Sequence, residues 1–413
     1  MTVVAKRARG AVHALRHTLS STRFATSRLR ALTFGTIAII ASSIVASLGA
    51  QAVATKPAAR IALAATPPTD SLREFAKLVA DLSEPGGYFD TDNLISNERS
   101  YLHVMGALDR LNVRGGAYIG VGPDQNFSYI ARIRPRIAFM VDIRRDNLLQ
   151  HLLFKALFAR SRNRAEYLAL WTGRPVPGDV ARYTDKPIEQ IVAWTDSARA
   201  TPASTRDAIA MVQRDVQTYG IPLSDSDLKT IARFHTEFIT AGLSLRFTST
   251  GRAPRDYYPT LRQLILERDL TGQLASYLAR ESDFQFVKSL ERRNLVVPVV
   301  GDMGGTHALP AIAQLLTQRG DHISAMYASN AEDYVMRDGG FARYATSILA
   351  MPRDARSVFI RSWFGGEGSH PENEPGYFST QLVQTFDDFA ADMAAGGYRA
   401  YFELTRKHVV PLR

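Results

Sequence analysis

Short, continuous apolar runs recur along the chain and end in polar turns. Five of them are typical of buried strands, at residues 117–121, 137–141, 295–300, 322–328 and 356–363. Apolar runs of this kind, separated by helical segments, favour a largely parallel sheet covered on both faces. The pattern therefore predicts an α/β fold, Rossmann-like, with a mostly parallel sheet and helices on both faces. A late strand is also expected at 398–405.

Helical periodicity fills the segments between these runs. A helical N-terminal extension is expected over 69–112, and an almost uniformly apolar helix over 147–159 should be buried. The block from about 160 to 290, between the second and third strands, predicts a helical insertion or cap over the sheet edge. Further helices are expected from Gly305 or Thr306 to Arg319, over 333–350 with a break at Gly339, and over 379–395.

The first 54 residues have a different composition. Residues 1–30 carry seven cations and no acid, an apolar run follows at 31–50, and small-residue A-x-A sites lie at 50–54. This arrangement predicts a secretory signal peptide, or an uncleaved N-terminal membrane anchor, because about 20 apolar residues suffice to span a bilayer. In either case the folded part is exported or anchored in the inner membrane. Residues 55–68 are predicted to be a linker, and 69–413 a Rossmann-like domain.

The leader also explains the charge of the chain. The formal net charge is +10, but beyond residue 30 the balance is only 43 Lys and Arg against 40 Asp and Glu. We therefore expect no nucleic-acid partner. The chain has no cysteine, which excludes disulfides and thiolate metal sites. No histidines pair at metal-ligand spacing, so no metal site is predicted.

A glycine-rich turn follows the first predicted strand. Gly120 and Gly122 lie in it, and Asp142 ends the second strand, 22 residues after Gly120. Nucleotide-binding α/β units place a carboxylate for the ribose hydroxyls at about this spacing. The turn is not the complete G-x-G-x-x-G motif, because position 125, where the motif has its third glycine, is not a glycine. An ordinary strand–turn–helix connection without a ligand is the alternative.

Polar residues also follow the other predicted strands. They include Asp302, Asn330, Glu332 and Arg361. In open α/β sheets, ligands bind outside the carboxyl ends of the strands. These clusters, together with the glycine turn, therefore predict a small-molecule site at one edge of the sheet.

Several single residues have two interpretations. Asp124 and Asn126 either contact a ligand or cap the helix that follows. Asn97 and Glu98 either cap a helix or form a lid over the ligand. Arg144 and Arg145 either hold an acidic substrate or are solvated. His307 could act as a base or lie in solvent, whereas His151, on an apolar helix, is expected in the core.

The chain resembles Rossmann-like, S-adenosylmethionine-dependent methyltransferases, and more narrowly a little-characterised bacterial family of proteins related to them. The resemblance is carried by LSEPGGYFDTDNLISNE at 82–98, YIGVGPDQNFSYIARIRPRIAFMVDIRRDNLLQHLLFKALF at 118–158, VVPVVGDMGGTHAL at 296–309, YASNAEDYV at 327–335 and SVFIRSWF at 357–364.

This resemblance implies a role for each matching position. Gly120 and Gly122 would face the methionine part of the cofactor, Asp142 its ribose and Asp302 its adenine, while Asn330 would contact the substrate. Two departures stand out. No acid precedes the glycines, and Ser329-Asn330-Ala331-Glu332 lacks the Pro-Pro-aromatic continuation of amino-methylating enzymes.

Two functions follow. The first is an exported or anchored methyltransferase-like protein that uses S-adenosylmethionine, with an unknown acceptor. The second is a non-catalytic, exported small-ligand-binding protein on the same scaffold, because a fold does not guarantee an activity. Export argues against the first function, since the usual methyl donor is a cytoplasmic metabolite.

Overall fold

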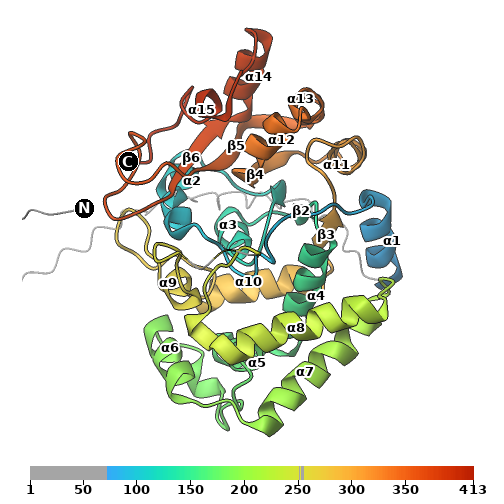
Figure 1. The fold of residues 1–413 in the computed structure, drawn as a ribbon, viewed down its shortest axis with the longest axis vertical. Helices are drawn as coiled ribbons and strands as arrows, with labels where there is room; N and C mark the ends of the chain where they lie inside the picture. The colour runs from blue at the N-terminus through green and yellow to red at the C-terminus, as the bar shows by residue number, and fades with distance from the viewer. Residues whose placement is uncertain (1–71, 251, 253–254) are drawn as a thin grey trace, which may run out of the picture. The chain divides into compact units, whose positions relative to one another are not determined.

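Six strands form one sheet at the centre of the fold, which a computed structural model describes for residues 72–250, 252 and 255–413 (Figure 1). The strand order is β3-β2-β1-β4-β5-β6, and only β6 runs antiparallel to its neighbour. The strands are β1 Ala117–Gly120, β2 Ile137–Asp142, β3 Val296–Val300, β4 Ile323–Ser329, β5 Arg353–Trp363 and β6 Thr380–Thr385. The predicted Rossmann-like α/β fold is confirmed, with β1 to β5 at the predicted places.

The sequence explains why these runs form strands. β1 to β3 are buried along their whole length, as expected for parallel strands covered on both faces. Pro298 interrupts β3 but is tolerated because β3 is an edge strand and pairs only with β2. β5 and β6 close the opposite edge of the sheet as an antiparallel pair.

Helices lie on both faces of the sheet. Right-handed crossovers place the helices that follow β1 and β2 on one face, and those that follow β3 and β4 on the other. The first group is α3 Asn126–Ile133, α4 Arg145–Arg160 and α10 Glu281–Arg292, and the second is α11 Ala308–Arg319, α12 Ala331–Arg337 and α13 Phe341–Leu349. α14 Phe386–Ala394 packs on β5 and β6.

The block between β2 and β3 is helical, as predicted. Its helices pack against α4 and against each other rather than over the sheet edge, and α4 is buried nearly all round between the two layers. They are α5 Arg164–Trp171, α6 Ile188–Ser197, α7 Pro202–Val216, α8 Asp225–Ala241 and α9 Leu261–Ile265. Figure 1 shows them as the green and yellow helices beyond α4.

Two predictions near the C-terminus are wrong. The expected helix at 379–395 begins as strand β6, and only α14 is helical. Residues 398–405 form no strand but contain the short helix α15 Tyr401–Leu404. The buried positions Tyr398, Tyr401 and Leu404 recur every three residues, which is a helical spacing.

The N-terminal extension divides into helices and an extended segment. α1 Leu72–Leu82 buries Phe75, Val79 and Leu82, and a 3-10 turn at Arg99–Leu102 precedes α2 Met105–Arg110. Between them, residues 83–98 form an extended segment, called the strap below. The signal or anchor predicted for 1–54 and the linker predicted for 55–68 lie outside the described residues.

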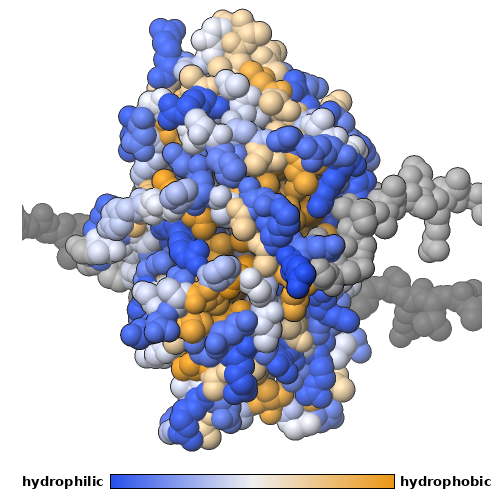
Figure 2. All heavy atoms as spheres, turned by 90° about the vertical axis from the view of Figure 1, so that its right-hand side faces the viewer, coloured by the Kyte–Doolittle hydropathy of each residue, from blue (hydrophilic) through white to orange (hydrophobic). Residues whose placement is uncertain are grey.

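The surface on the α1 and α11 side is mixed in character. Figure 2 shows hydrophilic side chains over much of it and hydrophobic ones gathered toward the middle. Among the helices of the described ranges, none is long and apolar enough to cross a membrane.

Candidate functional site

A pocket of about 260 Å³ lies at the carboxyl ends of the parallel strands. The strand register explains its position. Gly120 at the end of β1 lies beside Tyr327 of β4, and Asp142 at the end of β2 lies beside Val300 of β3. The turns after four neighbouring strands therefore meet at one edge, where α/β sheets usually bind ligands.

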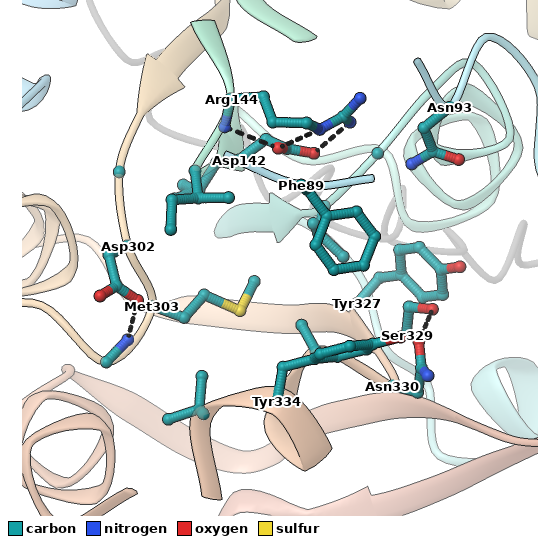
Figure 3. A pocket seen from close by; sticks show the side chains of 18 of the residues that line it. Phe89, Asn93, Asp142, Arg144, Asp302, Met303, Tyr327, Ser329, Asn330 and Tyr334 are labelled. Atoms are coloured by element: carbon teal, nitrogen blue, oxygen red, sulfur yellow. Dashed lines mark hydrogen bonds and ion pairs between the residues drawn. The ribbon is translucent and has the colours of Figure 1, made fainter. Parts of the chain in front are cut away.

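Six residues predicted from the sequence line this pocket together. They are Gly122 after β1, Asp142 at the end of β2, Asp302 after β3, Asn330 after β4, and Asn97 and Glu98 of the strap. Figure 3 shows Asp142, Asp302 and Asn330 on different sides of the cavity. The structure thus brings together residues that are far apart in the sequence.

Gly120 and Asn126 do not line the pocket. The Asn126 side chain packs against Gly120, and a Cβ atom at Gly120 would lie 2.0 Å from Asn126 Oδ1. Asn126 is fully buried, accepts a hydrogen bond from Tyr118 Oη and donates to the carbonyls of Val121 and Pro123. It therefore holds the shape of the turn, which corrects the ligand-binding prediction for both residues.

Gly122 has a different reason to be glycine. Its φ is +84°, in the left-handed region that favours glycine. A Cβ atom there would lie 3.1 Å from Asn93 Nδ2 of the strap, which also lines the pocket. Because Gly122 has no side chain, its backbone is accessible between β1 and the strap, and a ligand can approach it closely.

Glu332 and Arg361 pair with each other instead of lining the pocket. Arg361 donates from Nε (2.5 Å) and Nη2 (3.1 Å) to the Glu332 carboxylate. Tyr344 Oη also donates to Glu332, and Arg361 Nη1 donates to Gln384 Oε1. Both charged side chains are at least 98% buried. The pair ties β5 to α12, so neither side chain lies in the pocket, where the predicted substrate or lid role would place it.

Asp124 is buried beside α3 rather than in the pocket. Its Oδ2 accepts a long hydrogen bond of 3.4 Å from Tyr277 Oη, and its Oδ1 has no hydrogen-bond partner. Burial raises the pKa of the Asp124 carboxyl to about 7. Asp124 therefore does not lie where the predicted ligand contact would place it.

Asp142 faces the pocket but is already engaged by Arg144. Its Oδ1 accepts from the backbone N and Nε of Arg144, and its Oδ2 accepts from Nη2 at 2.9 Å. Arg144 Nη1 also donates to the carbonyls of Thr91 and Asp92 in the strap. Oδ2 has accepted a single bond, so it can accept one more from a ligand hydroxyl.

Asp302 closes the β3 end of the pocket. Its backbone N donates to Glu84 Oε1 of the strap at 2.9 Å, and its Oδ1 accepts from the Gly304 N at 2.8 Å. These contacts fix the turn after β3 and leave Oδ2 with no protein donor among the described residues. That oxygen can accept a hydrogen bond from a ligand amino group.

The strap crosses the strand ends in the same order as the sheet. Ser83 and Glu84 bond with Val300 of β3, Gly87 N donates to the Ile143 carbonyl after β2, and Asn93 faces Gly122 after β1. At its far end, Glu98 reaches β4, β5 and β6. The segment that crosses the strand ends is therefore longer than Asn97 and Glu98, the two residues for which a lid was predicted.

Glu98 has four neutral hydrogen-bond donors and is 1% exposed. Its Oε2 accepts from Tyr327 Oη (2.6 Å), Ser362 Oγ (2.7 Å) and Gln381 Nε2 (2.5 Å), and its Oε1 accepts from Ser329 Oγ. No Lys, Arg or His in the described part of the chain forms an ion pair with it. A buried carboxylate without a cation is costly unless hydrogen bonds satisfy it.

The end of β4 carries local backbone strain. Ser329 has a φ of +52°, which is unfavourable for a residue with a side chain. Such strain persists where surrounding contacts hold it, and it clusters at functional sites. Here the hydrogen bond to Glu98 holds Ser329, and the next residue, Asn330, faces the pocket.

The sequence analysis missed the aromatic residues of the pocket. Phe89 of the strap and Tyr334 of α12 meet edge to face, with ring centroids 5.0 Å apart. In Figure 3 the Phe89 ring lies between Asp142 and Tyr327. An apolar ring in an otherwise polar loop was the available signal for Phe89. Tyr334 is part of the YASNAEDYV segment, but no role was assigned to it.

The two histidines considered from the sequence, His151 and His307, do not line the pocket. His151 is buried, as expected, and its Nε2 bonds with the Gly122 carbonyl at 3.0 Å. His307 is exposed beside the Asp81 carbonyl and does not line the pocket. Within residues 72–250, 252 and 255–413, no three His, Cys, Asp or Glu side chains are grouped so as to hold a metal ion.

Comparison with protein families gives a match over most of the described chain. The sequence profile of a domain of unknown function, DUF7790, matches residues 94–218 and 248–409. The match includes the four strand ends around the pocket and the end of the strap from Leu94, but not Phe89 or Asn93. No curated protein matches the chain.

Proposed function

The chain belongs to the DUF7790 family of domains of unknown function, and from the chemistry of its pocket we propose that it binds S-adenosylmethionine or a closely related nucleoside-type ligand. The protein is a methyltransferase-like protein whose acceptor is unknown. The observation that carries this proposal is the convergence of Gly122, Asp142, Asp302 and Asn330, from four strand ends, on one pocket.

The dimensions and chemistry of the pocket support this ligand class. β3 and β4 are three strand spacings apart, or roughly 14 Å, so the pocket spans enough of the sheet edge for a ligand with two different ends. Asp142 offers an acceptor for ribose hydroxyls and Asp302 one for an adenine amino group. Met303 and Ile143 supply apolar surface for a flat base.

Catalysis in such a site needs alignment more than acid–base chemistry. Methyl transfer from a sulfonium is accelerated when donor and acceptor are held in line, which positioning alone can achieve. Asn330, beside the strained Ser329 at the end of β4, is our candidate for orienting the acceptor. This role rests on the resemblance and on its position in the pocket.

A non-catalytic binding protein is the second candidate. The Asp142 carboxylate already holds Arg144, and the Phe89 ring lies inside the cavity, which favours tight enclosure of a small ligand. Export of the chain, predicted from residues 1–54, fits this alternative better because the methyl donor is made in the cytoplasm. Sequencing the mature N-terminus would decide between a cleaved signal and an anchor.

The ligand proposal is tested by titration calorimetry of the full-length chain with S-adenosylmethionine and S-adenosylhomocysteine. We expect binding, and a loss of about 10-fold or more in Asp142→Asn, because a hydrogen bond to a charged acceptor is removed. Asp227→Asn is the matched control, since Asp227 pairs with the neighbouring Arg145 outside the pocket. Absence of binding by the folded wild type would remove the proposal.

A further inference from the structure

The β4 end of the pocket has more hydrogen-bond acceptors than donors. Glu98 Oε2 is saturated by three donors, but Oε1 accepts from Ser329 alone and can accept another bond. Glu98 lines the pocket, so a ligand can supply the missing donor.

Gln125 provides a second, independent acceptor at the same place. It lines the pocket, is 5% exposed, and donates from Nε2 to Tyr327 Oη at 3.3 Å. Its Oε1 is buried without a hydrogen-bond partner. Buried polar atoms are nearly always paired in folded proteins, so an unpaired acceptor beside a cavity indicates a ligand donor.

The charges around the pocket favour a cation. Four carboxylates line it against two guanidinium groups: Glu98, Asp142, Asp302 and Asp338 against Arg144 and Arg343. Arg144 is engaged by Asp142, and Arg343 donates to the Gly304 carbonyl. Neither arginine compensates Glu98, whose partners are all neutral.

We propose that Glu98 and Gln125 form a subsite for a positively charged amino group of a ligand. An ammonium has three donors and no acceptor. It can therefore donate to both open acceptors around Tyr327, which are Glu98 Oε1 and Gln125 Oε1. Its charge also compensates the buried carboxylate, and charge-assisted hydrogen bonds are the strong ones. The subsite lies at the β4 end, across the pocket from Asp302 at the β3 end.

The ammonium has two possible sources. It is either the amino group of the amino-acid part of an S-adenosylmethionine-type ligand, a reading that rests on the proposed function, or the amine of a separate molecule bound beside the nucleoside. The chemistry at Glu98 is the same for both, so two arms of one experiment separate them.

The first arm compares S-adenosylhomocysteine with 5′-methylthioadenosine, which lacks the amino-acid part. Titration calorimetry on the full-length wild type should show tighter binding of S-adenosylhomocysteine. Glu98→Gln should remove this preference, a loss of about 10- to 100-fold, and leave 5′-methylthioadenosine unchanged. That result assigns the subsite to the nucleoside ligand.

The second arm uses n-butylammonium and neutral n-butanol as probes, with S-adenosylhomocysteine present. If the subsite serves a separate amine, n-butylammonium but not n-butanol raises the melting temperature of the wild type, and Glu98→Gln removes the shift. Glu367→Gln is the matched control, because it removes the same charge from an exposed loop. It should behave as the wild type in both arms.

Gln125→Leu is a second test of the subsite in case Glu98→Gln does not fold. It leaves all four donors to Glu98 in place. It should weaken binding of the ammonium probe in the same direction. The proposal is overturned if the wild type shows no ammonium preference in either arm, or if the folded variants keep it. Failure of both nucleosides to bind overturns the proposed function instead, and the n-butylammonium arm then decides on the subsite alone.

Discussion

At Gly122, the conformation of the backbone and access to the pocket depend on the same residue. Its left-handed φ and its position opposite Asn93 both follow from the turn that ends β1. A side chain there costs conformational energy and also fills space between the strap and the turn. The two effects can be separated by comparison with a second glycine, at which a side chain would have the conformational cost but would fill no space at the pocket.

We predict that Gly122→Ala destabilises the protein by about 1 kcal/mol and also weakens binding of S-adenosylhomocysteine at least several-fold. Gly368→Ala is the matched control, because Gly368 has a similar φ of +71° but open space around its Cβ position. It should lose similar stability with unchanged binding. Urea midpoints and calorimetry measure the two quantities, and equal binding by both variants would contradict a ligand near Gly122.

Single residues also show what the sequence could predict about the site. Polar residues after strands were expected to converge, and Asp142, Asp302 and Asn330 do so. Glu332 and Arg361 satisfy the same pattern but neutralise each other, because β5 and α12 bring them together in the core. The sequence does not reveal which partner a polar side chain meets. Glu98, for example, bonds with Gln381, which is 283 positions away.

At the scale of elements, the strap is the part of the fold that encloses the pocket. Its contacts with the sheet ends are mainly hydrogen bonds, and Tyr88 within it is 79% exposed. A segment with few buried apolar contacts opens at lower free energy than the sheet beneath it. Arg144 holds its middle through the carbonyls of Thr91 and Asp92.

We predict that Arg144→Gln increases amide hydrogen exchange in residues 86–97 without changing exchange in β1 to β4. Arg145→Gln is the control, since Arg145 binds Asp227 and the Pro222 carbonyl on the side of α8. It should leave strap exchange unchanged. Equal amide protection of the strap in wild type and Arg144→Gln would contradict this role of Arg144. The other contacts of the strap would then be enough to hold it closed.

The elements also show where pattern reasoning succeeds. β1 to β5 were predicted because buried parallel strands are continuous apolar runs. β6 was missed because Thr380–Thr385 has only two apolar residues, Leu382 and Val383, and lies directly before the helical residues of α14, whose periodicity dominated the window. Gln381 and Gln384 are buried there with hydrogen-bond partners that include Glu98 and Arg361, which the sequence pattern does not reveal.

At the scale of the whole molecule, buried titratable groups set the response to pH. Burial lowers the pKa values of His103, His151 and His235 to about 4. It raises the pKa values of Asp124 and Glu291 to about 7. Between about pH 6.5 and 4, the unfolded chain therefore binds more protons at the three histidines, and the folded protein more at the two acids.

The histidines make stability fall as the pH drops from 6.5 toward 4, because their folded pKa values lie below the unfolded value. The acids act in the opposite sense: their contribution is present at low pH and is lost as the pH rises through 7. Each group changes the free energy of unfolding by about 1.4 kcal/mol per pH unit in its window. Among these five groups three oppose two, so together they lower the stability in mild acid.

We predict that His235→Gln flattens this loss and that Asp124→Asn steepens it. His235 is fully buried, and its replacement removes a side chain that binds a proton in the unfolded chain but not in the folded protein. Asp124→Asn removes a group that takes up a proton favourably in the folded state. Urea midpoints at pH 4.5, 6 and 8 measure both effects, and parallel pH profiles for both variants and the wild type would contradict the assignment.

The strap follows the order of the strands beneath it, and this has a kinetic consequence. Ser83 and Glu84 hold one end at β3 and Glu98 holds the other at β4, β5 and β6, so the middle of the strap is the part that can open. Opening of this middle part alone would admit or release a small molecule without any disruption of the sheet. Such an opening belongs to the microsecond-to-millisecond scale of loop motions.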